Sequence, residues 1–115
     1  MQDAKELDAK RSPSVAMILE AARTHHVPII GGSIPEYCND KIYNTAMAIP
    51  PYGDLITKHR KIHLFDVNVP GGICFRESDT LSPGDSFTVF PYASPTAVMS
   101  IGIGVCYDMR FPELA

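Results

Sequence analysis

One cysteine stands where a thiol could act as a nucleophile. Cys106 lies in "GIGVCYDMRFPE", residues 102–113, between a glycine-spaced apolar run and a charged turn that contains proline. A cysteine at the C-terminal end of a strand, just before a helix begins, lies where backbone N–H groups and the helix dipole favour an anion. Such a place would favour the thiolate, the nucleophilic form of cysteine. Position alone fits a small buried apolar side chain somewhat better.

A second stretch gathers basic and imidazole side chains. It is "KHRKIHLFD", residues 58–66, at the end of an expected strand. In a strand, Lys61 and His63 would face one side while Ile62 and Leu64 face the other. A charged run of this kind is usually a solvated strand end. The functional alternative is a partly buried Lys61 that stabilises an oxyanion.

Metal and phosphate sites are not indicated by the residue spacing. His59 and His63 could form a metal pair, but no third and fourth ligand appears at a recognisable spacing. "GGS", residues 31–33, lacks both the lysine and the full glycine pattern of a phosphate-binding loop.

Composition limits the class of protein. The chain has 115 residues, enough for one domain with a modest core, and a net charge of -3, which argues against a general nucleic-acid binder. Its 3 cysteines (Cys38, Cys74 and Cys106) are widely spaced and odd in number, so a reducing compartment is favoured over a secreted disulfide framework. The charged opening is no signal peptide, and no run approaches the length of a membrane span. We expect a soluble protein.

Alternating elements are predicted along the chain. Ser12 and Pro13 have the types expected at the start of a helix, and apolar residues at helical spacing continue it to about His25. The expected strands are a buried one at 27–30 stopped by Gly31 and Gly32, a hairpin of 42–49 with 55–61, and a pair at 87–90 and 97–105. Residues 107–115 should begin a further helix. This order predicts a layered α/β or α+β domain.

Five segments carry a resemblance to a known family. They are "GGSIPE", "KIYNTA", "KHRKIHLFDVNVPG", "ESDTLSPGDSF" and "GIGVCYDMRFPELA", in this order within residues 12–115. Together they resemble the nitrilase superfamily of carbon–nitrogen hydrolases and, within it, the ω-amidase branch. The resemblance implies an α/β fold that is part of the nitrilase-type α-β-β-α sandwich, truncated at both ends. Residues 1–115 would then be the central portion of a single carbon–nitrogen hydrolase domain.

The resemblance also implies roles for single residues. Cys106 matches the family's nucleophile and Lys61 its catalytic lysine. Glu77, in "FRESDT", matches a second glutamate that helps to position the substrate and the lysine. The backbone N–H of Tyr107 matches half of the oxyanion hole. Arg110 and Glu113 match structural positions, which we expect to form a charge pair that braces the turn.

The family's general base has no counterpart in this sequence. The matching glutamate would fall upstream of Met1, and the glutamates before Lys61 (Glu6, Glu20 and Glu36) do not match it. We therefore expect these 115 residues alone to be inactive and the strand edges of a partial sandwich to favour aggregation.

The implied reaction is amide hydrolysis through a cysteine thioester. An ω-amidase would act on small dicarboxylate monoamides such as 2-oxoglutaramate, without a metal or organic cofactor, as a homodimer of the full-length enzyme. Its compartment would be the cytoplasm or the mitochondrion, with no membrane and no nucleic acid as partners.

Three alternatives remain open. The first is a sibling amidase that acts on deaminated glutathione, although "KIHLFDVNVPG" and "LSPGDSF" favour the ω-amidase branch. The second is a non-catalytic truncated module that binds a full-length partner through the same face. The third, a nucleic-acid binder that uses "KHRK", is disfavoured by the acidic net charge.

Overall fold

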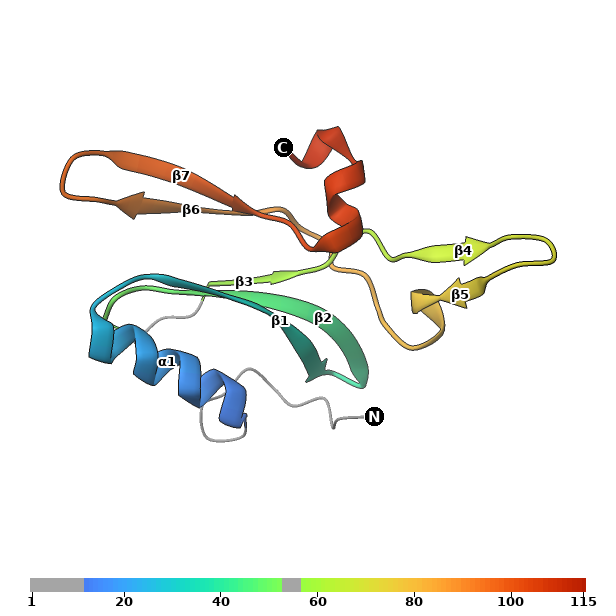
Figure 1. The fold of residues 1–115 in the computed structure, drawn as a ribbon, viewed down its shortest axis with the longest axis horizontal. Helices are drawn as coiled ribbons and strands as arrows, with labels where there is room; N and C mark the ends of the chain where they lie inside the picture. The colour runs from blue at the N-terminus through green and yellow to red at the C-terminus, as the bar shows by residue number, and fades with distance from the viewer. Residues whose placement is uncertain (1–11, 53–56) are drawn as a thin grey trace.

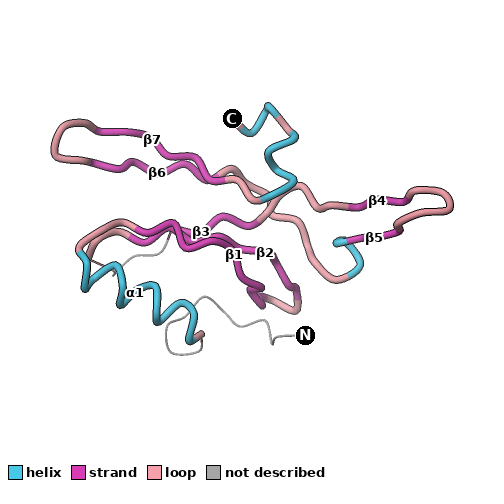
Figure 2. The backbone as a smooth tube through the Cα atoms, viewed as in Figure 1, coloured by secondary structure: helices cyan, strands magenta, loops and turns pink. Residues whose placement is uncertain are grey.

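A three-stranded antiparallel sheet lies between one helix and a β-hairpin in the computed structural model, which describes residues 12–52 and 57–115 (Figure 1). The sheet has the order β1-β2-β3 and follows helix α1, Pro13–His25. Its strands are β1 Ile29–Cys38, β2 Lys41–Ile49 and β3 Thr57–Arg60. Two separate hairpins follow, with strands β4 Asp66–Asn68, β5 Cys74–Arg76, β6 Thr88–Ala93 and β7 Val98–Ile103. Short 3-10 turns lie at η1 Glu77–Asp79, η2 Cys106–Arg110 and η3 Pro112–Leu114 (Figure 2).

Helix α1 begins and ends where the sequence predicts. The Ser12 hydroxyl accepts a hydrogen bond from the Val15 N–H at 3.4 Å, and Pro13 occupies the first turn, where its missing N–H costs nothing. His26, in the left-handed conformation with φ 53°, ends the helix. The apolar residues at helical spacing form its buried face against the sheet.

Residues 45–49 of strand β2 are buried on both faces and so join the layers. Met47 and Ile49 face the helix, where they pack in a cluster with Val15, Leu19 and Ala22. Ala46 and Ala48 face the opposite side and pack with Ile103 and Val105, next to Phe90 of β6. A strand alternates its side chains between its faces, so this alternation places α1 and the β6–β7 hairpin on opposite sides of one sheet. The succession of helix, sheet and second strand layer confirms the predicted α/β sandwich arrangement in this part of the fold.

The strand predicted at 27–30 is wrong in extent and in burial. Strand β1 continues through Gly31 and Gly32 to Cys38, with a bulge between Ile30 and Ser33 where its register to β2 shifts. Ile30 is 57% exposed. Gly32 has φ 71°, in the region that favours glycine, and a Cβ at Gly31 would lie 2.9 Å from the end of the Ile18 side chain of α1. The glycines therefore permit a bulge under the helix and do not stop the strand.

The two predicted strand pairs are confirmed, with shorter ends. β2 pairs with β3 and β6 pairs with β7, both antiparallel. Residues 55 and 56 of the strand predicted at 55–61 lie outside the described residues, and β3 ends at Arg60, so Lys61 follows the strand. β7 ends at Ile103, three residues before Cys106.

Two features of the fold differ from the prediction in kind. The β4–β5 hairpin was not predicted, because its strands have only three residues each. The expected C-terminal helix is replaced by η2 and η3, because Pro112 disfavours a helical conformation at Phe111, which is extended at φ -113° and ψ 99°.

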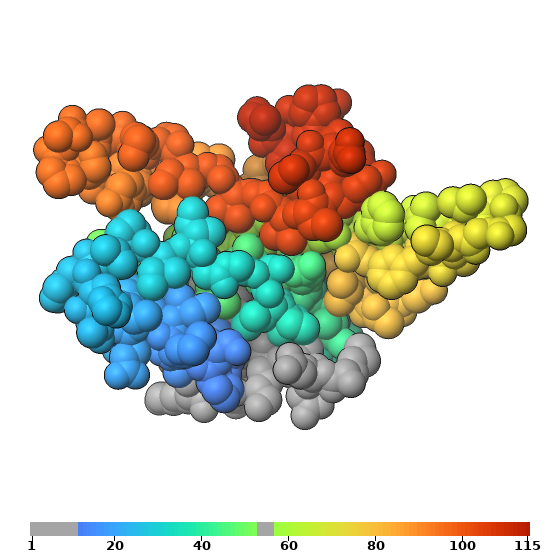
Figure 3. Space-filling view, viewed as in Figure 1, coloured from blue at the N-terminus to red at the C-terminus, as the bar shows by residue number. Residues whose placement is uncertain are grey.

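The β4–β5 and β6–β7 hairpins project toward opposite ends of the molecule (Figure 3). Among the helices of the described ranges, none is long and apolar enough to cross a membrane.

Replacement of Gly84 by alanine tests the close packing that holds the segment after β3. A Cβ at Gly84 would overlap the Arg60 carbonyl oxygen, and the Gly84 N–H donates to the Lys61 carbonyl at 2.9 Å. We expect Gly84→Ala to lower the free energy of unfolding by about 1–3 kcal/mol, measured by urea denaturation of the complete gene product. Gly102→Ala is the matched control, since a Cβ added there would meet no atom within 4 Å, and it should stay within about 0.5 kcal/mol of wild type. Equal stability of the two variants would contradict this packing.

Candidate active site

Lys61 is a buried lysine whose main chain is fixed on both sides. Its N–H donates to the Asn44 carbonyl at 2.8 Å, and its carbonyl accepts from the Gly84 N–H at 2.9 Å. The residue is only 1% exposed, which excludes the alternative of a solvated strand end at this position. Its ammonium donates to Glu77 Oε2 at 2.5 Å. A buried ammonium needs such a partner because desolvation of an unpaired charge is costly.

Glu77 holds the lysine from the start of η1. The same Oε2 that accepts from Lys61 also accepts the Phe65 N–H at 2.7 Å, and the Glu77 side chain is 17% exposed. The turn itself is closed by the Leu81 N–H, which donates to the Glu77 carbonyl at 2.8 Å. One carboxylate oxygen thus links the lysine to the segment that follows it.

Cys106 is an exposed thiol on a constrained backbone. It is the first residue of η2 and has φ 51°, in the left-handed region that residues other than glycine rarely occupy. Such a conformation costs on the order of 1–3 kcal/mol and persists only where neighbouring contacts impose it. Its exposure excludes the interpretation as a small buried apolar side chain.

The contacts that hold this turn come from Asp108, a residue that the sequence analysis did not single out. Its side chain is fully buried and accepts from the Val105 N–H, the His63 N–H and ring, and the His59 ring, at 2.8–3.1 Å. Burial alone would raise the pKa of Asp108, but these hydrogen bonds outweigh it and lower the pKa to about 2. The carboxylate is therefore ionised at neutral pH and joins η2 to the chain around Lys61.

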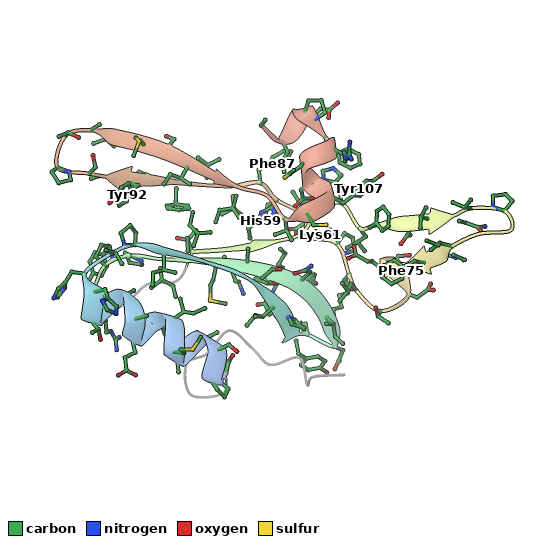
Figure 4. The ribbon with its side chains drawn as sticks, in the orientation of Figure 1. His59, Lys61, Phe75, Phe87, Tyr92 and Tyr107 are labelled. Atoms are coloured by element: carbon green, nitrogen blue, oxygen red, sulfur yellow. The ribbon has the colours of Figure 1, made fainter. Side chains whose placement is uncertain are left out.

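Aromatic rings make a second link between the same segments. The Tyr107 ring meets Phe65 edge to face at 5.2 Å and Phe111 at 5.3 Å between centroids. His63 stacks on Phe111 at 3.7 Å. Figure 4 shows His59, Lys61 and Tyr107 gathered where η2 meets the end of β3.

The opposite face of β3 has its own buried carboxylate. Glu36, which is 2% exposed, accepts from Thr45 at 2.7 Å, from Lys58 at 2.6 Å and from Arg60 at 2.8 and 3.0 Å. Burial would raise the pKa of Glu36, but hydrogen bonds from Arg60, Lys58 and Thr45 lower it to about 2. Arg60 also lies over the Tyr43 ring, at 4.0 Å from its centroid.

The expected charge pair does not brace the turn at the site. The charge pair expected between Arg110 and Glu113 is wrong within the described part of the chain: both residues are exposed, and no ion pair joins them. Asp108 braces the turn in their place. His59 and His63 share Asp108, and within residues 12–52 and 57–115 no group of three or more histidine, cysteine or acidic residues could hold a metal.

Comparison with known proteins assigns the chain to a family. The family model described as carbon-nitrogen hydrolase matches residues 1–115. The chain belongs to the carbon–nitrogen hydrolase family. It is 53% identical over 102 residues to Omega-amidase NIT2 of Mus musculus, covering 89% of this chain and 36% of that protein. It is 50% identical over 114 residues to "Omega-amidase, chloroplastic" of Arabidopsis thaliana, covering 97% of this chain and 30% of that protein.

A solved structure confirms the fold of this carbon–nitrogen hydrolase. The crystal structure of Saccharomyces cerevisiae Nit3, a member of branch 10 of the nitrilase superfamily, matches with a TM-score of 0.71 and 42% sequence identity. The match covers 90% of this chain and 34% of that one. The chain thus spans about a third of the length of these relatives. The predicted family and fold are confirmed for that portion, and the roles of Cys106, Lys61, Glu77 and Tyr107 stay predictions.

The two buried carboxylates predict how the stability of the fold depends on pH. Glu36 and Asp108 have pKa values lowered from 4.5 and 3.8 to about 2 in the folded chain. The unfolded chain therefore binds more protons between about pH 4 and pH 2, so the free energy of unfolding falls as pH falls through that window and is insensitive to these groups above about pH 5.

Urea denaturation of the complete gene product at pH 6, 4 and 3 measures this dependence. Glu36→Gln removes one of the two carboxylates and should lose less stability than wild type between pH 6 and pH 3. Equal stability of the wild-type protein at pH 6 and pH 3 would contradict the strongly hydrogen-bonded state of both groups.

Proposed function

We propose that the protein is an ω-amidase-like amidohydrolase that converts small dicarboxylate monoamides, such as 2-oxoglutaramate, to the 2-oxo acid and ammonia. The observation that carries the proposal is the buried pair of Lys61 with Glu77, linked through Phe65 to the turn that presents Cys106. The identity of 53% with a mouse omega-amidase supports the substrate class. A buried, oriented ammonium that is linked to the turn of an exposed thiol suits the hydrolysis of an amide, whose carbonyl is a poor electrophile.

In the first half of the reaction the Cys106 sulfur attacks the amide carbonyl carbon. A carbon–sulfur bond forms, and the carbonyl electron pair moves onto the oxygen. Lys61 and the Tyr107 N–H donate to that oxyanion. Glu77 accepts one hydrogen of the Lys61 ammonium, which leaves two others for the oxyanion. Collapse of the intermediate breaks the carbon–nitrogen bond, releases ammonia and leaves a thioester on Cys106.

A general base completes the cycle by taking the thiol proton, passing it to the leaving ammonia and then activating the water that cleaves the thioester. Glu36 is unsuited to this role because Lys58, Arg60 and Thr45 occupy its oxygens and its pKa is about 2. Glu20 lies exposed on α1. Glu6 does not match the family's base either, so the proposal assigns the base to a glutamate outside these 115 residues, and a polypeptide of these residues alone is expected to be inactive.

The proposal extends to partners and compartment. The substrate is a small amide, no metal or organic cofactor takes part, and the full-length enzyme is a homodimer. The cytoplasm or the mitochondrion is the proposed compartment, while one relative carries the word chloroplastic in its name.

Replacement of Cys106 tests the nucleophile. We expect Cys106→Ala in the complete gene product to abolish ammonia release from 2-oxoglutaramate while the circular dichroism spectrum and unfolding midpoint stay close to wild type, because the side chain is exposed. Cys38→Ala and Cys74→Ala are matched controls and should keep full turnover. Substantial activity in Cys106→Ala would remove this residue from the reaction.

Replacement of Lys61 tests the oxyanion role. We expect Lys61→Ala to lower kcat by about 10²–10³-fold with a smaller change in KM, since its interaction strengthens as the oxyanion forms. Steady-state kinetics of ammonia release separate the two parameters. A loss confined to KM, with normal kcat, would show that Lys61 only binds substrate.

A further inference from the structure

We propose that Asp108 is a positioning residue for this reaction: its carboxylate fixes the backbone of Cys106 and sets the separation between Cys106 and Lys61. The inference rests on the proposed function, because it gives Asp108 a part in that reaction. Asp108 acts through its neighbours and touches no substrate, since its side chain is fully buried.

Two hydrogen bonds between Val105 and Asp108 close the turn that contains the thiol. The Val105 N–H donates to Asp108 Oδ2 at 3.0 Å, and the Asp108 N–H donates to the Val105 carbonyl at 3.0 Å. Cys106 lies inside this doubly closed turn. Its left-handed φ of 51° is costly for a residue with a side chain, so the closure supplies the constraint that keeps it there.

The Asp108 carboxylate also binds residues on both sides of Lys61. Asp108 Oδ1 accepts both the His63 N–H at 2.9 Å and His63 Nδ1 at 2.8 Å, and Oδ2 accepts His59 Nε2 at 3.1 Å. His59 and His63 lie two residues before and two residues after Lys61. One carboxylate therefore binds the chain on both sides of the lysine. It also closes the turn of the nucleophile, which lies two residues before Asp108.

The carboxylate has no capacity left for another role. A carboxylate offers about four acceptor positions, and four donors occupy them here, two on each oxygen. An amide in its place would put an NH₂ group against a backbone N–H in either orientation, that of His63 or that of Val105. Asp108→Asn is thus a change of equal size that removes hydrogen bonds on one side of the network whichever way it turns.

Misplacement of the thiol relative to the ammonium should lower kcat. The sulfur must reach the carbonyl carbon while the Lys61 ammonium reaches the oxygen of the same group, and an error of about 1 Å can cost about 10²-fold in rate. Substrate binding that depends on other parts of the site should change much less.

The principal experiment compares Asp108→Asn with Glu36→Gln in the complete gene product. Both residues are buried carboxylates that bind side chains of β3, but Glu36 lies on the face away from Cys106 and binds Lys58 and Arg60. We expect Asp108→Asn to lower kcat at least about 50-fold with KM within about threefold, whereas Glu36→Gln keeps kcat within about twofold. Urea denaturation of both variants shows whether their losses of stability are comparable.

A second pair of variants tests the network if Asp108→Asn does not fold. His63 is partly exposed, and an asparagine there can place an amide N–H where the ring Nδ1–H now donates to Asp108. We expect His63→Leu to lower kcat at least about tenfold and His63→Asn to restore it to within about threefold of wild type. A role in stability alone would leave kcat of the folded fraction unchanged in both variants.

The outcomes separate this inference from the proposed function. A kcat for Asp108→Asn or His63→Leu within about twofold of the Glu36→Gln value, or a change in KM alone, overturns the inference even if the wild type is an amidase. If the wild type releases no ammonia, the proposed function fails by itself, and the rate of Cys106 alkylation by iodoacetamide takes the place of turnover. The inference then requires Asp108→Asn to change that rate at least about fivefold, with Cys38 and Cys74 as internal references, and an unchanged rate overturns it.

Discussion

The buried carboxylate of Asp108 is the interaction on which the geometry of the site depends. A charge in the interior is tolerated only when its acceptor positions are filled, and here the donors come from Val105, just before η2, and from both sides of Lys61. Apolar packing makes this contact available, because Ile103 and Val105 are buried against Ala46 and Ala48 of β2. Apolar packing thus holds the β6–β7 hairpin against β2, and the Asp108 carboxylate fixes the position of the Cys106 turn relative to the chain around Lys61.

Strand β3 and the residue after it show how a charged stretch becomes an ordered part of the fold. Lys58 and Arg60 turn to one face, where they bind Glu36, while His59 turns to the other, where it binds Asp108. Lys61 is buried and paired with Glu77. Lys58, Arg60 and Lys61 each pair with a carboxylate, so this charged stretch is held in the fold on both faces of the strand and is not a solvated strand end.

Local signals were sufficient for some elements and insufficient for others. The cap at Ser12 and the apolar spacing of α1 lie within one segment, so the helix was predicted correctly. The bulge between Ile30 and Ser33 keeps the chain paired with β2, a contact across the sheet that the local sequence does not show, and strand β1 was therefore predicted to end too early. In the candidate site, Cys106, Lys61 and Glu77 were named by resemblance. Asp108 was missed because its histidine partners lie 45 and 49 residues earlier, although its place two residues after the nucleophile was a signal that could have found it.

A double-mutant cycle on kcat between Asp108→Asn and Lys61→Ala tests most directly whether one carboxylate places the thiol against the ammonium. Each single variant and the double variant would be measured in the complete gene product under single-turnover conditions. If Asp108 acts by setting the separation of Cys106 from Lys61, its replacement costs at least about tenfold less when the lysine is already absent. Losses that simply multiply in the double variant would contradict the account, because Asp108 would then affect kcat independently of Lys61.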